Sequence, residues 1–542
     1  MRNRISRISD EAGNWISNED DIKNLIQFHF SNLFAGNDSS DYSHLIDLIP
    51  KKVTDNMNSL LLKPISIQEV KAAVFSLGGS KAAGPDGIPG SFYQKSWDII
   101  KLDLFRAVQS FFTSGHMLRK WNETAIVLIP KVKTPESISQ FRPISLINFS
   151  YKIISKVMVN RLKPIVNEII SPEQSAFVTG RLIQDNIIVA QEVFSFLKRK
   201  RRGKAFYGAL KLDMNKAYDR VNWSFLGAVL SKLGFNEHWC KLILECVSSC
   251  SMRILFNGQP LPVFYPGKGL RQGDPLSPYL FILVSECLSI MITHALLSKK
   301  FQGIKITKNA PLITHSLFAD DSLFFFNGDL NHCVALNDIL KNYCRASGQV
   351  INYNKSSLVF SKNTPSEFKD QVAAIFGVPI TESPGKYLGL PSDWGRSKKQ
   401  ALTWVKDRIQ SKMSGWKEKL LSQAGKDVLI KAVIQSMPVY AMSIFKFPDY
   451  FCNELNSMVA NFWWKKSSSK GVHWKSWSHV SKNKKDGGLG FRDFRLLNSA
   501  LLAKQTWRLL SYPDSLCARV LKGIYFPTVR KPFFNPSGFL NS

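Results

Sequence analysis

The sequence HSLFADDSLFFF, residues 315–326, places two adjacent aspartates, Asp320 and Asp321, inside a run of leucines and phenylalanines. Neighbouring carboxylates repel each other, and apolar surroundings make each of them harder to ionise. The run therefore predicts two short strands that meet at the aspartates. Either the pair faces water in a hairpin turn, where Asp is common, or a positive ligand compensates its charge.

A third aspartate supports the second interpretation. Asp213 ends the apolar, strand-like segment FYGALKLD, and a strand-end Asp can converge with a hairpin Asp pair on neighbouring strands of one sheet. Three such carboxylates would hold two divalent cations about 3.5–4 Å apart, which activate an attacking hydroxyl and stabilise the departing oxygens. Mg²⁺ prefers oxygen ligands of this kind, together with substrate phosphates.

Two further segments carry candidate ligand-binding residues. In GLRQGDPLSPYLF, residues 269–281, Gly273 and Pro275 let the backbone approach a nucleotide closely and open a helix, although an ordinary helix start would look the same. Upstream, LIPKVK and FRPISL contain Lys131 and Arg142, which either bind a triphosphate or are surface charges.

Composition and charge restrict the class of protein. The 542 residues carry 72 Lys+Arg against 41 Asp+Glu, a net charge of +31, which favours a polyanionic partner, nucleic acid first and an anionic membrane second. With 44% hydrophobic residues the chain can pack several cores. No uninterrupted apolar run reaches about 18 residues, so no membrane span is predicted. The eight cysteines contain no C-x-x-C and the start lacks a signal peptide, so we expect an intracellular location, in the nucleus or the cytoplasm.

Alternating strand-like and helix-like segments predict an α+β fold. Cys246 and Cys250 are expected on one helix face as core residues. The basic run KRKRRGK, residues 198–204, is either a nuclear-localisation or RNA-contacting patch or a solvated loop. Between Arg396 and Lys431 basic residues outnumber acidic ones, and apolar residues recur at helical spacing, which predicts amphipathic helices that grip a duplex. The apolar positions are Leu402, Val405, Ile409, Met413 and Trp416.

Eight motifs follow one another in a specific order: KAAGPDG, LIPK, FRPISL, ALKLDMNKAYDRV, RQGDPLSPYLF, FADD, INYNKS and KYLGLP. This series resembles the reverse transcriptase of LINE-type (non-LTR) retrotransposons, particularly those abundant in plants. The resemblance extends from about residue 12 onward and is densest from about 113 to 392.

The resemblance implies a right-hand polymerase, with fingers, a palm built on an antiparallel sheet, a helical thumb and a small C-terminal extension. The expected divisions are a linker-like N-terminal segment (1–60), an N-terminal extension of the fingers (61–112), the reverse transcriptase domain (113–392), the thumb (393–460) and an incomplete zinc-binding-like region (461–542).

Residue roles follow from the same resemblance. The catalytic and metal-binding residues would be Asp213, Asp320 and Asp321. The nucleotide-binding residues would be Lys131, Arg142, Tyr218, Gln272 and Gly273. The primer and template residues would be Phe318, Tyr387, Leu388 and Gly389. Lys355 would lie near the leaving pyrophosphate as a candidate general acid, unless it is a solvated lysine after a strand.

Tyr218 bears on the choice of sugar. An aromatic ring against the 2′ carbon leaves no room for a 2′-OH, so deoxynucleotides would be selected; the alternative is a core aromatic. Asp219 follows Asp213 by six residues, a spacing similar to that of RNA-dependent RNA polymerases. Ala217-Tyr218 and the ADD rather than GDD turn favour DNA synthesis.

Some features depart from the family pattern. Phe318 stands where many reverse transcriptases carry Tyr, and Ser481 stands where the zinc-binding tail has Cys. The remaining candidates, Cys452, Cys517, His473 and His479, are unsuitably spaced, so no zinc is expected. The upstream endonuclease domain of the family is missing from the sequence, which suggests a truncated copy.

The expected activity is RNA-directed DNA polymerisation with two Mg²⁺ ions, for which Mn²⁺ is a substitute, and the expected partners are an RNA template, a DNA primer and dNTPs, without a membrane. The alternatives are a catalytically dead nucleic-acid-binding remnant of a decayed element, or an RNA-dependent RNA polymerase. The sequence does not indicate an oligomeric state.

Overall fold

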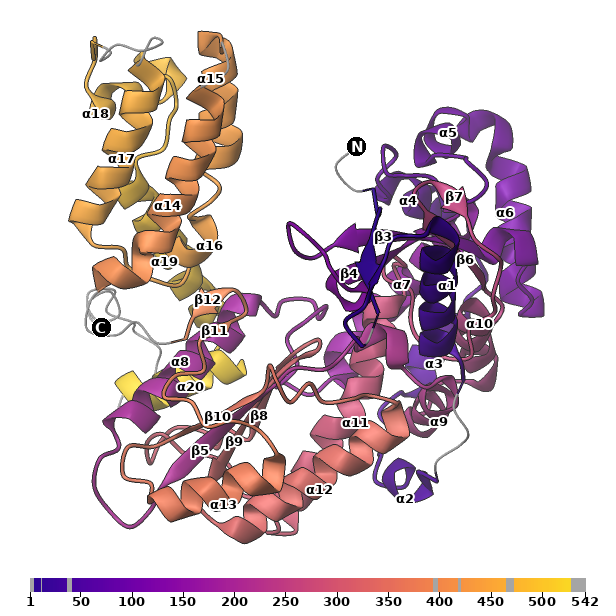
Figure 1. Ribbon diagram of the computed structural model, residues 1–542, viewed down its shortest axis with the longest axis horizontal. Coiled ribbons are helices and arrows are strands. Elements are labelled where there is room, and N and C mark those ends of the chain that lie inside the picture. The colour runs from indigo at the N-terminus through magenta and orange to yellow at the C-terminus, as the bar shows by residue number, and fades with distance from the viewer. Residues whose placement is uncertain are drawn as a thin grey trace.

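The structure, a computed structural model, describes residues 4–10, 12–36, 41–392, 398–417, 421–464 and 472–527. Helices and strands are mixed along the chain, and two four-stranded sheets lie between layers of helices (Figure 1). This confirms the α+β expectation. Arg396 of the predicted basic region lies outside the described residues.

The first sheet carries the aspartates. Its strands are β5 (Tyr207–Leu212), β8 (His315–Phe318), β9 (Asp321–Asn327) and β10 (Ser357–Phe360). They are ordered β10-β5-β9-β8 and all neighbours are antiparallel. The sheet is therefore the antiparallel one that the sequence predicts.

The phenylalanine run of β9 is buried on both faces of this sheet. Phe324 and Phe326 pack into one hydrophobic core and Phe325 packs into another. The first core includes α9 (Trp223–Leu233), α11 (Ser277–Leu297) and α12 (Leu330–Ser347). The second includes α8 (Ile183–Arg199) and α20 (Leu516–Tyr525). Because helices cover both faces, the strand is continuously apolar rather than alternating.

The second sheet is mixed, with the order β4-β3-β6-β7. Its strands are β3 (Glu123–Pro130), β4 (Phe141–Ile147), β6 (Ser251–Phe256) and β7 (Gln259–Pro260), and β3 and β6 are parallel. A hairpin turn at Asn257-Gly258 joins β6 and β7. Helix α1 (Glu19–Phe34) packs on this sheet through Ile22, Ile26 and Phe30.

Helix α11 is the core helix between the two sheets. Among the described residues it alone is long and apolar enough to cross a membrane, and 78% of its most apolar window is buried inside the protein. Around it lie α7 (Phe149–Ile169) and α10 (Glu237–Ser248). Cys246 and Cys250 are both buried, but the expected shared helix face is wrong, because α10 ends at Ser248 and Cys250 lies just before β6.

The remaining short strands and helices connect these layers. They are β1 (Ile8–Ser9), β2 (Trp15–Ile16), α2 (Ser43–Ile46), α3 (Asp55–Leu62), α4 (Ile67–Ser76), α5 (Gly90–Lys95), α6 (Trp97–Ser114), β11 (Lys386–Tyr387), β12 (Leu390–Pro391) and α13 (Ser366–Phe376). The basic run 198–204 spans the end of α8 and an exposed loop that leads to β5.

A helical bundle follows, formed by α14 (Lys398–Lys417), α15 (Gln423–Leu429), α16 (Val439–Met442), α17 (Asp449–Trp464), α18 (Trp477–Val480) and α19 (Phe494–Ser511). It stands beside the first sheet, and α20 returns from it to α8 (Figure 1). Leu402, Val405, Ile409 and Met413 are buried, as their helical spacing predicts, and Trp416 is half-buried. Helix α17 continues through residue 460, the expected end of the thumb. Its buried residues before and after that position belong to the same hydrophobic core.

Candidate active site

The three aspartates meet at one end of the first sheet. Asp213 directly follows β5, whose last residue, Leu212, pairs with Ser322 of β9. Phe318 pairs with Asp321 and closes a tight turn, called here the aspartate turn (318–321). Asp213 is therefore carried to the same end of the sheet as Asp320 and Asp321, as the sequence predicts.

The negative charge of each aspartate makes its neighbours harder to ionise. Burial, followed by the negative Asp320, raises the pKa of Asp321 to about 6. Burial by surrounding protein atoms raises the pKa of Asp320, and the charge of Asp213 raises it further. A bound cation would reverse both effects.

Asp213 is held by the segment before β10. Asn352 Nδ2 donates a 3.1 Å hydrogen bond to Asp213 Oδ2, and the Asn352 backbone N–H donates to the Asp213 carbonyl at 2.8 Å. The Ser356 hydroxyl accepts a bond from the Asp213 N–H at 3.2 Å. Lys355 Nζ lies 4.0 Å from Asp213 Oδ2 while most of its side chain is exposed. Sequence reasoning noticed Lys355 but missed Asn352.

The carboxylates suit a hard divalent cation in their chemistry, because all three offer oxygen donors. Within the described ranges, no three His, Cys, Asp or Glu side chains are gathered as a ready-made metal cluster. The Asp213 carboxylate faces Asn352 and Lys355. Cys452 and Cys517, the thiols considered for zinc, are buried in the second core.

Two cationic side chains lie opposite the aspartates, on the hairpin of β3 and β4. Arg142 is exposed on β4, and Lys131 follows β3, with its ammonium donating to the Ser139 carbonyl at 2.9 Å. Burial lowers the pKa of Lys131, and the nearby charges of Lys355 and Arg142 lower it further. Asp213 acts on Lys131 in the opposite direction, so these groups border one space.

Gln272 and Gly273 lie in the loop before α11 and adjoin the same hairpin. The Ser145 N–H of β4 donates to the Gln272 carbonyl at 2.9 Å. Gly273 has φ +121°, and a Cβ there would lie 3.0 Å from the Ser145 carbonyl oxygen. Glycine is therefore required both by the backbone conformation and by the close approach.

Tyr218 and Asp219 lie beside the loop that contains Gln272 and the start of α11. The Tyr218 ring is half-buried and stacks on Phe281 of α11, with ring centroids 4.8 Å apart and planes 10° apart. Burial raises the pKa of Tyr218, and the charge of Asp320 adds to this. Asp219 is buried; Oδ1 accepts a 3.2 Å bond from Gln272 Nε2, and Oδ2 has no partner.

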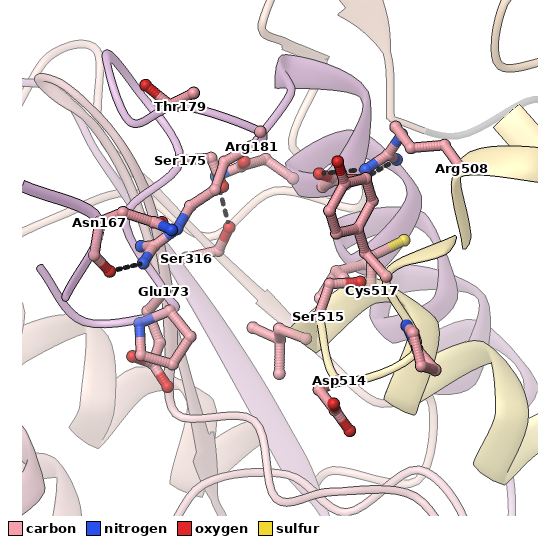
Figure 2. Close-up of a pocket in the computed structure, with 18 of the residues that line it drawn as sticks. Asn167, Glu173, Ser175, Thr179, Arg181, Ser316, Arg508, Asp514, Ser515 and Cys517 are labelled. Carbon is pink, nitrogen blue, oxygen red and sulfur yellow. Dashed lines mark hydrogen bonds and ion pairs between the residues drawn. The ribbon is translucent and has the colours of Figure 1, made fainter. Parts of the chain in front are cut away.

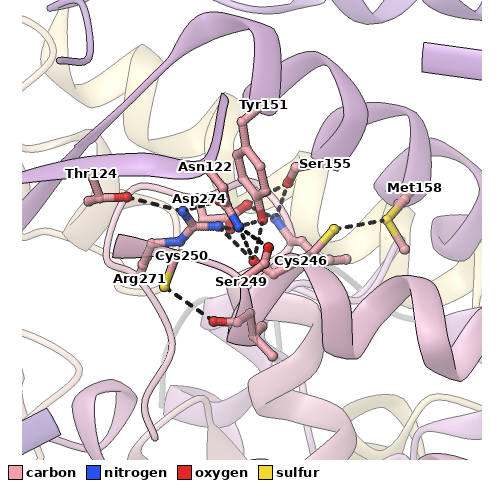
Figure 3. A network of polar contacts seen from close by, with 12 residues as sticks. Asn122, Thr124, Tyr151, Ser155, Met158, Cys246, Ser249, Cys250, Arg271 and Asp274 are labelled. Carbon is pink, nitrogen blue, oxygen red and sulfur yellow. Dashed lines mark hydrogen bonds and ion pairs between the residues drawn. The ribbon is translucent and has the colours of Figure 1, made fainter. Parts of the chain in front are cut away.

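A buried ionic network holds the loop before α11 in place (Figure 3). Arg271 pairs with Asp274 at 3.2 Å, and both side chains are almost completely buried. Asp274 also accepts hydrogen bonds from the Tyr151 hydroxyl at 2.7 Å and from Ser155. Arg271 donates to Asn122 Oδ1 at 2.6 Å. Sequence reasoning missed this network, although both charged residues belong to the RQGDP motif.

The segment 386–391 is a small hairpin of β11 and β12. Tyr387 is buried in the second core, where its ring anchors the hairpin. Leu388, at φ +47°, and Gly389 form the turn, and the Tyr440 hydroxyl donates to the Leu388 carbonyl at 2.8 Å. Lys211 of β5 donates to the Lys386 carbonyl at 2.6 Å, which ties the hairpin to the first sheet.

A cavity of about 370 Å³ lies elsewhere, between the loop 172–181, the start of α8 and the segment joining α19 to α20 (Figure 2). None of the three aspartates lines it. Its arginines are already engaged: Arg181 donates to the carbonyls of Gln174 at 2.7 Å and Ile170 at 2.8 Å, and Arg508 pairs with Asp185. This cavity is therefore not the nucleotide site.

Comparison with known proteins agrees with this geometry. Residues 129–392 match the protein family described as "Reverse transcriptase (RNA-dependent DNA polymerase)". The "Transposon TX1 uncharacterized 149 kDa protein" of Xenopus laevis is 26% identical over 555 residues, which cover 100% of this chain and 41% of the relative. The "Retrovirus-related Pol polyprotein from type-2 retrotransposable element R2DM" of Drosophila melanogaster is 27% identical over 335 residues, 60% of this chain and 30% of the relative.

A plant relative is similar over a shorter segment. The "Uncharacterized mitochondrial protein AtMg00310" of Arabidopsis thaliana is 44% identical over 94 residues, 17% of this chain and 61% of the relative. The chain spans less than half the length of the Xenopus and Drosophila proteins. Residues 129–392, just under half of the chain, thus form a domain of the reverse transcriptase family, and the Xenopus and Drosophila relatives carry the names of a transposon and of a retrotransposable element.

Proposed function

We propose that this chain extends a DNA 3′-OH on an RNA template with deoxynucleotides and releases pyrophosphate. One observation carries the proposal: Asp213, Asp320 and Asp321 meet at one end of the first sheet, opposite Lys131 and Arg142. Phosphoryl transfer requires carboxylates that hold metal ions and cations that hold a triphosphate. Here the two sets lie on two sides of one space.

The same proposal assigns parts of a right-hand polymerase. The first sheet, with α8, α9, α11 and α12, is the palm, and the second sheet, with the β3–β4 hairpin, belongs to the fingers. Helices α14 to α16 and most of α17 form the thumb, and the end of α17 with α18 to α20 belongs to the small C-terminal piece. We assign 1–60 to a linker-like segment, 61–112 to the extension of the fingers, 113–392 to the reverse transcriptase domain, 393–460 to the thumb and 461–542 to the C-terminal region.

The side chains of the site have distinct tasks in the reaction. Lys131 and Arg142 hold the triphosphate, while Gln272 and the backbone at Gly273 border the nucleotide. The primer 3′ oxygen attacks the α-phosphorus, the bond to the bridging oxygen breaks, and pyrophosphate leaves. Asp213, Asp320 and Asp321 would hold two Mg²⁺ ions, or Mn²⁺ in their place, which would supply positive charge for the attacking oxygen and for the leaving group.

Five further residues are assigned to the sugar, the leaving group and the primer end. The Tyr218 ring closes the space at the 2′ carbon of the sugar. Lys355, near Asp213, neutralises or protonates the leaving pyrophosphate. The hairpin that contains Leu388 and Gly389 holds the primer end, with Tyr387 as its buried anchor.

Primer extension on an RNA template, with Mg²⁺ and dNTPs, tests the proposal. We expect the parent to extend the primer and Asp320→Asn to lose nearly all activity while it still binds template–primer. Asp338→Asn, which changes an exposed carboxylate of α12, is the matched control and should extend like the parent. If the parent binds template–primer but does not extend it, the chain is a nucleic-acid-binding remnant and the proposal fails.

A further inference from the structure

The segment 173–177 lies against the edge of the first sheet, beside the aspartate turn. The Leu317 N–H donates to the Glu173 carbonyl at 2.8 Å, and the Ser175 N–H donates to the Leu317 carbonyl at 3.1 Å. Gln174 Oε1 accepts a 3.1 Å bond from the Ala319 N–H, inside the aspartate turn itself. The segment is therefore fixed relative to Asp320 and Asp321.

Phe177 is the last residue of this fixed segment and has an unusual backbone conformation. Its φ is +60°, in the left-handed region that bulky side chains rarely adopt. Its side chain is 44% exposed, while Ala176 and Val178 on either side are buried. The backbone is thus anchored on both sides of a residue whose ring points out of the core. Strained residues that surrounding structure holds in place are concentrated at binding sites.

Tyr279, in the first turn of α11, is the aromatic neighbour of Phe177. The two ring centroids are 6.5 Å apart and the planes are tilted by 47°. Tyr279 is half-buried, and α11 begins directly after the loop that contains Gln272. Two residues later, Phe281 lies under Tyr218. Residues two apart on a helix point about 200° away from each other, so Tyr279 faces away from the Phe281–Tyr218 stack, on the flank of α11 where Phe177 lies.

The positive charges of Arg181 and Arg519 act on the Glu173 carboxylate of this flank, and the two rings give the flank an aromatic surface. Lys131 and Arg142 belong to the β3–β4 hairpin, and Arg181, the arginine of the Phe177 loop, is committed to backbone carbonyls. A flank of this kind suits the flat face of a base better than a phosphate. Bases of every type stack on aromatic side chains.

We propose that Phe177 and Tyr279 form a stacking platform for an unpaired base of the template strand, beside the nucleotide space. The inference rests on the proposed polymerase function. The terminal base of the primer is already paired when it reaches the aspartates. The template is therefore the strand that presents an unpaired base at this point.

The test compares two labelled substrates by fluorescence anisotropy. One is an RNA template–DNA primer duplex with a 5′ template overhang, and the other is the same duplex with blunt ends. We expect Phe177→Ala to weaken binding of the overhanging duplex about tenfold, the size of effect that one stacked base gives, and to leave blunt-duplex binding unchanged. Phe177→Trp should restore the parent affinity, because it returns an aromatic face.

Two further variants separate stacking from folding. Phe177→Gly accepts the positive φ without strain, so it should keep the melting temperature within a few degrees and still lose the preference for the overhang. Phe92→Ala removes a ring that is 45% exposed and adjoins Tyr93, which matches the setting of Phe177 at another place. It should bind both duplexes like the parent.

Three results would overturn the platform: equal weakening of both duplexes by Phe177→Gly, no weakening of the overhanging one, or a parent that does not prefer the overhang. Failure of the proposed function gives a different result, namely no primer extension by the parent. The binding comparison is interpretable in that case too, because it does not depend on turnover.

Discussion

Asn352 contacts Asp213 at two points: its backbone N–H donates to the Asp213 carbonyl at 2.8 Å, and its side-chain amide donates to the carboxylate at 3.1 Å. The first bond fixes the end of β5, and the second fixes the direction of the carboxylate. An amide that orients a metal-binding carboxylate contributes to activity without touching the substrate.

We therefore expect Asn352→Ala to lower the rate of primer extension about 10- to 100-fold, since Asp213 loses its fixed orientation. Single-turnover extension at saturating Mg²⁺ measures this. Asn337→Ala is the matched control, because Asn337 Nδ2 also donates to a backbone carbonyl, that of Ile375, away from the site. Equal rates for the two variants would show that Asn352 has only a structural role.

Replacement of Tyr218 tests the sugar selection. Tyr218→Val removes the ring that stacks on Phe281 and opens space at the 2′ carbon, so incorporation of ribonucleotides relative to deoxynucleotides should rise by about tenfold or more. Tyr218→Phe keeps the ring and should keep the selection. A parent that already uses ribonucleotides as well as deoxynucleotides would favour an RNA-dependent RNA polymerase instead.

The buried Asp219 should make stability depend on pH. Burial raises its pKa from 3.8 to about 6, so between these values the folded state binds more protons than the unfolded state. Its contribution to stability is therefore complete below about pH 4 and is lost as the pH rises through 6. Relative to the parent, Asp219→Asn should gain about 1–3 kcal/mol in free energy of unfolding between pH 4 and pH 7. Urea titrations at both pH values measure this, and a difference independent of pH would contradict it.

Removal of one partner of the buried Arg271–Asp274 pair should be costly. Arg271→Met leaves the Asp274 carboxylate buried without its cation, and we expect a loss of about 3–5 kcal/mol in free energy of unfolding. Exposed Lys232 also pairs with an aspartate, Asp47, at 2.7 Å, so Lys232→Met provides the control and should change stability by less than about 1 kcal/mol. A similar small loss for Arg271→Met would mean that the loop before α11 can relax.

Much of the framework could be predicted from local sequence. The apolar run around Asp320 and Asp321 gives β8 and β9, and the helical spacing of Leu402 to Met413 gives the buried face of α14. In both places each residue's environment follows from its immediate neighbours. Such patterns predict the type of element, because a helix or strand forms where its apolar residues can be buried on one face or on both.

The parts of the site that the sequence does not predict depend on contacts between residues that are far apart along the chain. Asn352 lies 139 residues from Asp213 and Asn122 lies 149 residues from Arg271, and no local pattern predicts such a pair. Tyr387 shows the same dependence on packing: the resemblance assigns it to the primer end, and the structure adds that its ring is buried in the second core. A motif gives the position of a residue along the chain, but packing determines the direction of its side chain.

The return of α20 to α8 has a mechanical consequence for the helical bundle. The bundle is joined to the first sheet at its start by the hairpin that Lys211 holds, and at its end by Arg508 with Asp185 and by the Thr307 hydroxyl, which donates to the Gly523 carbonyl at 2.8 Å. The bundle also shares the second hydrophobic core with α8 and the first sheet. Connections at both ends and a common core therefore hold the bundle in one position beside the sheet, so that a bound duplex would meet a preset surface.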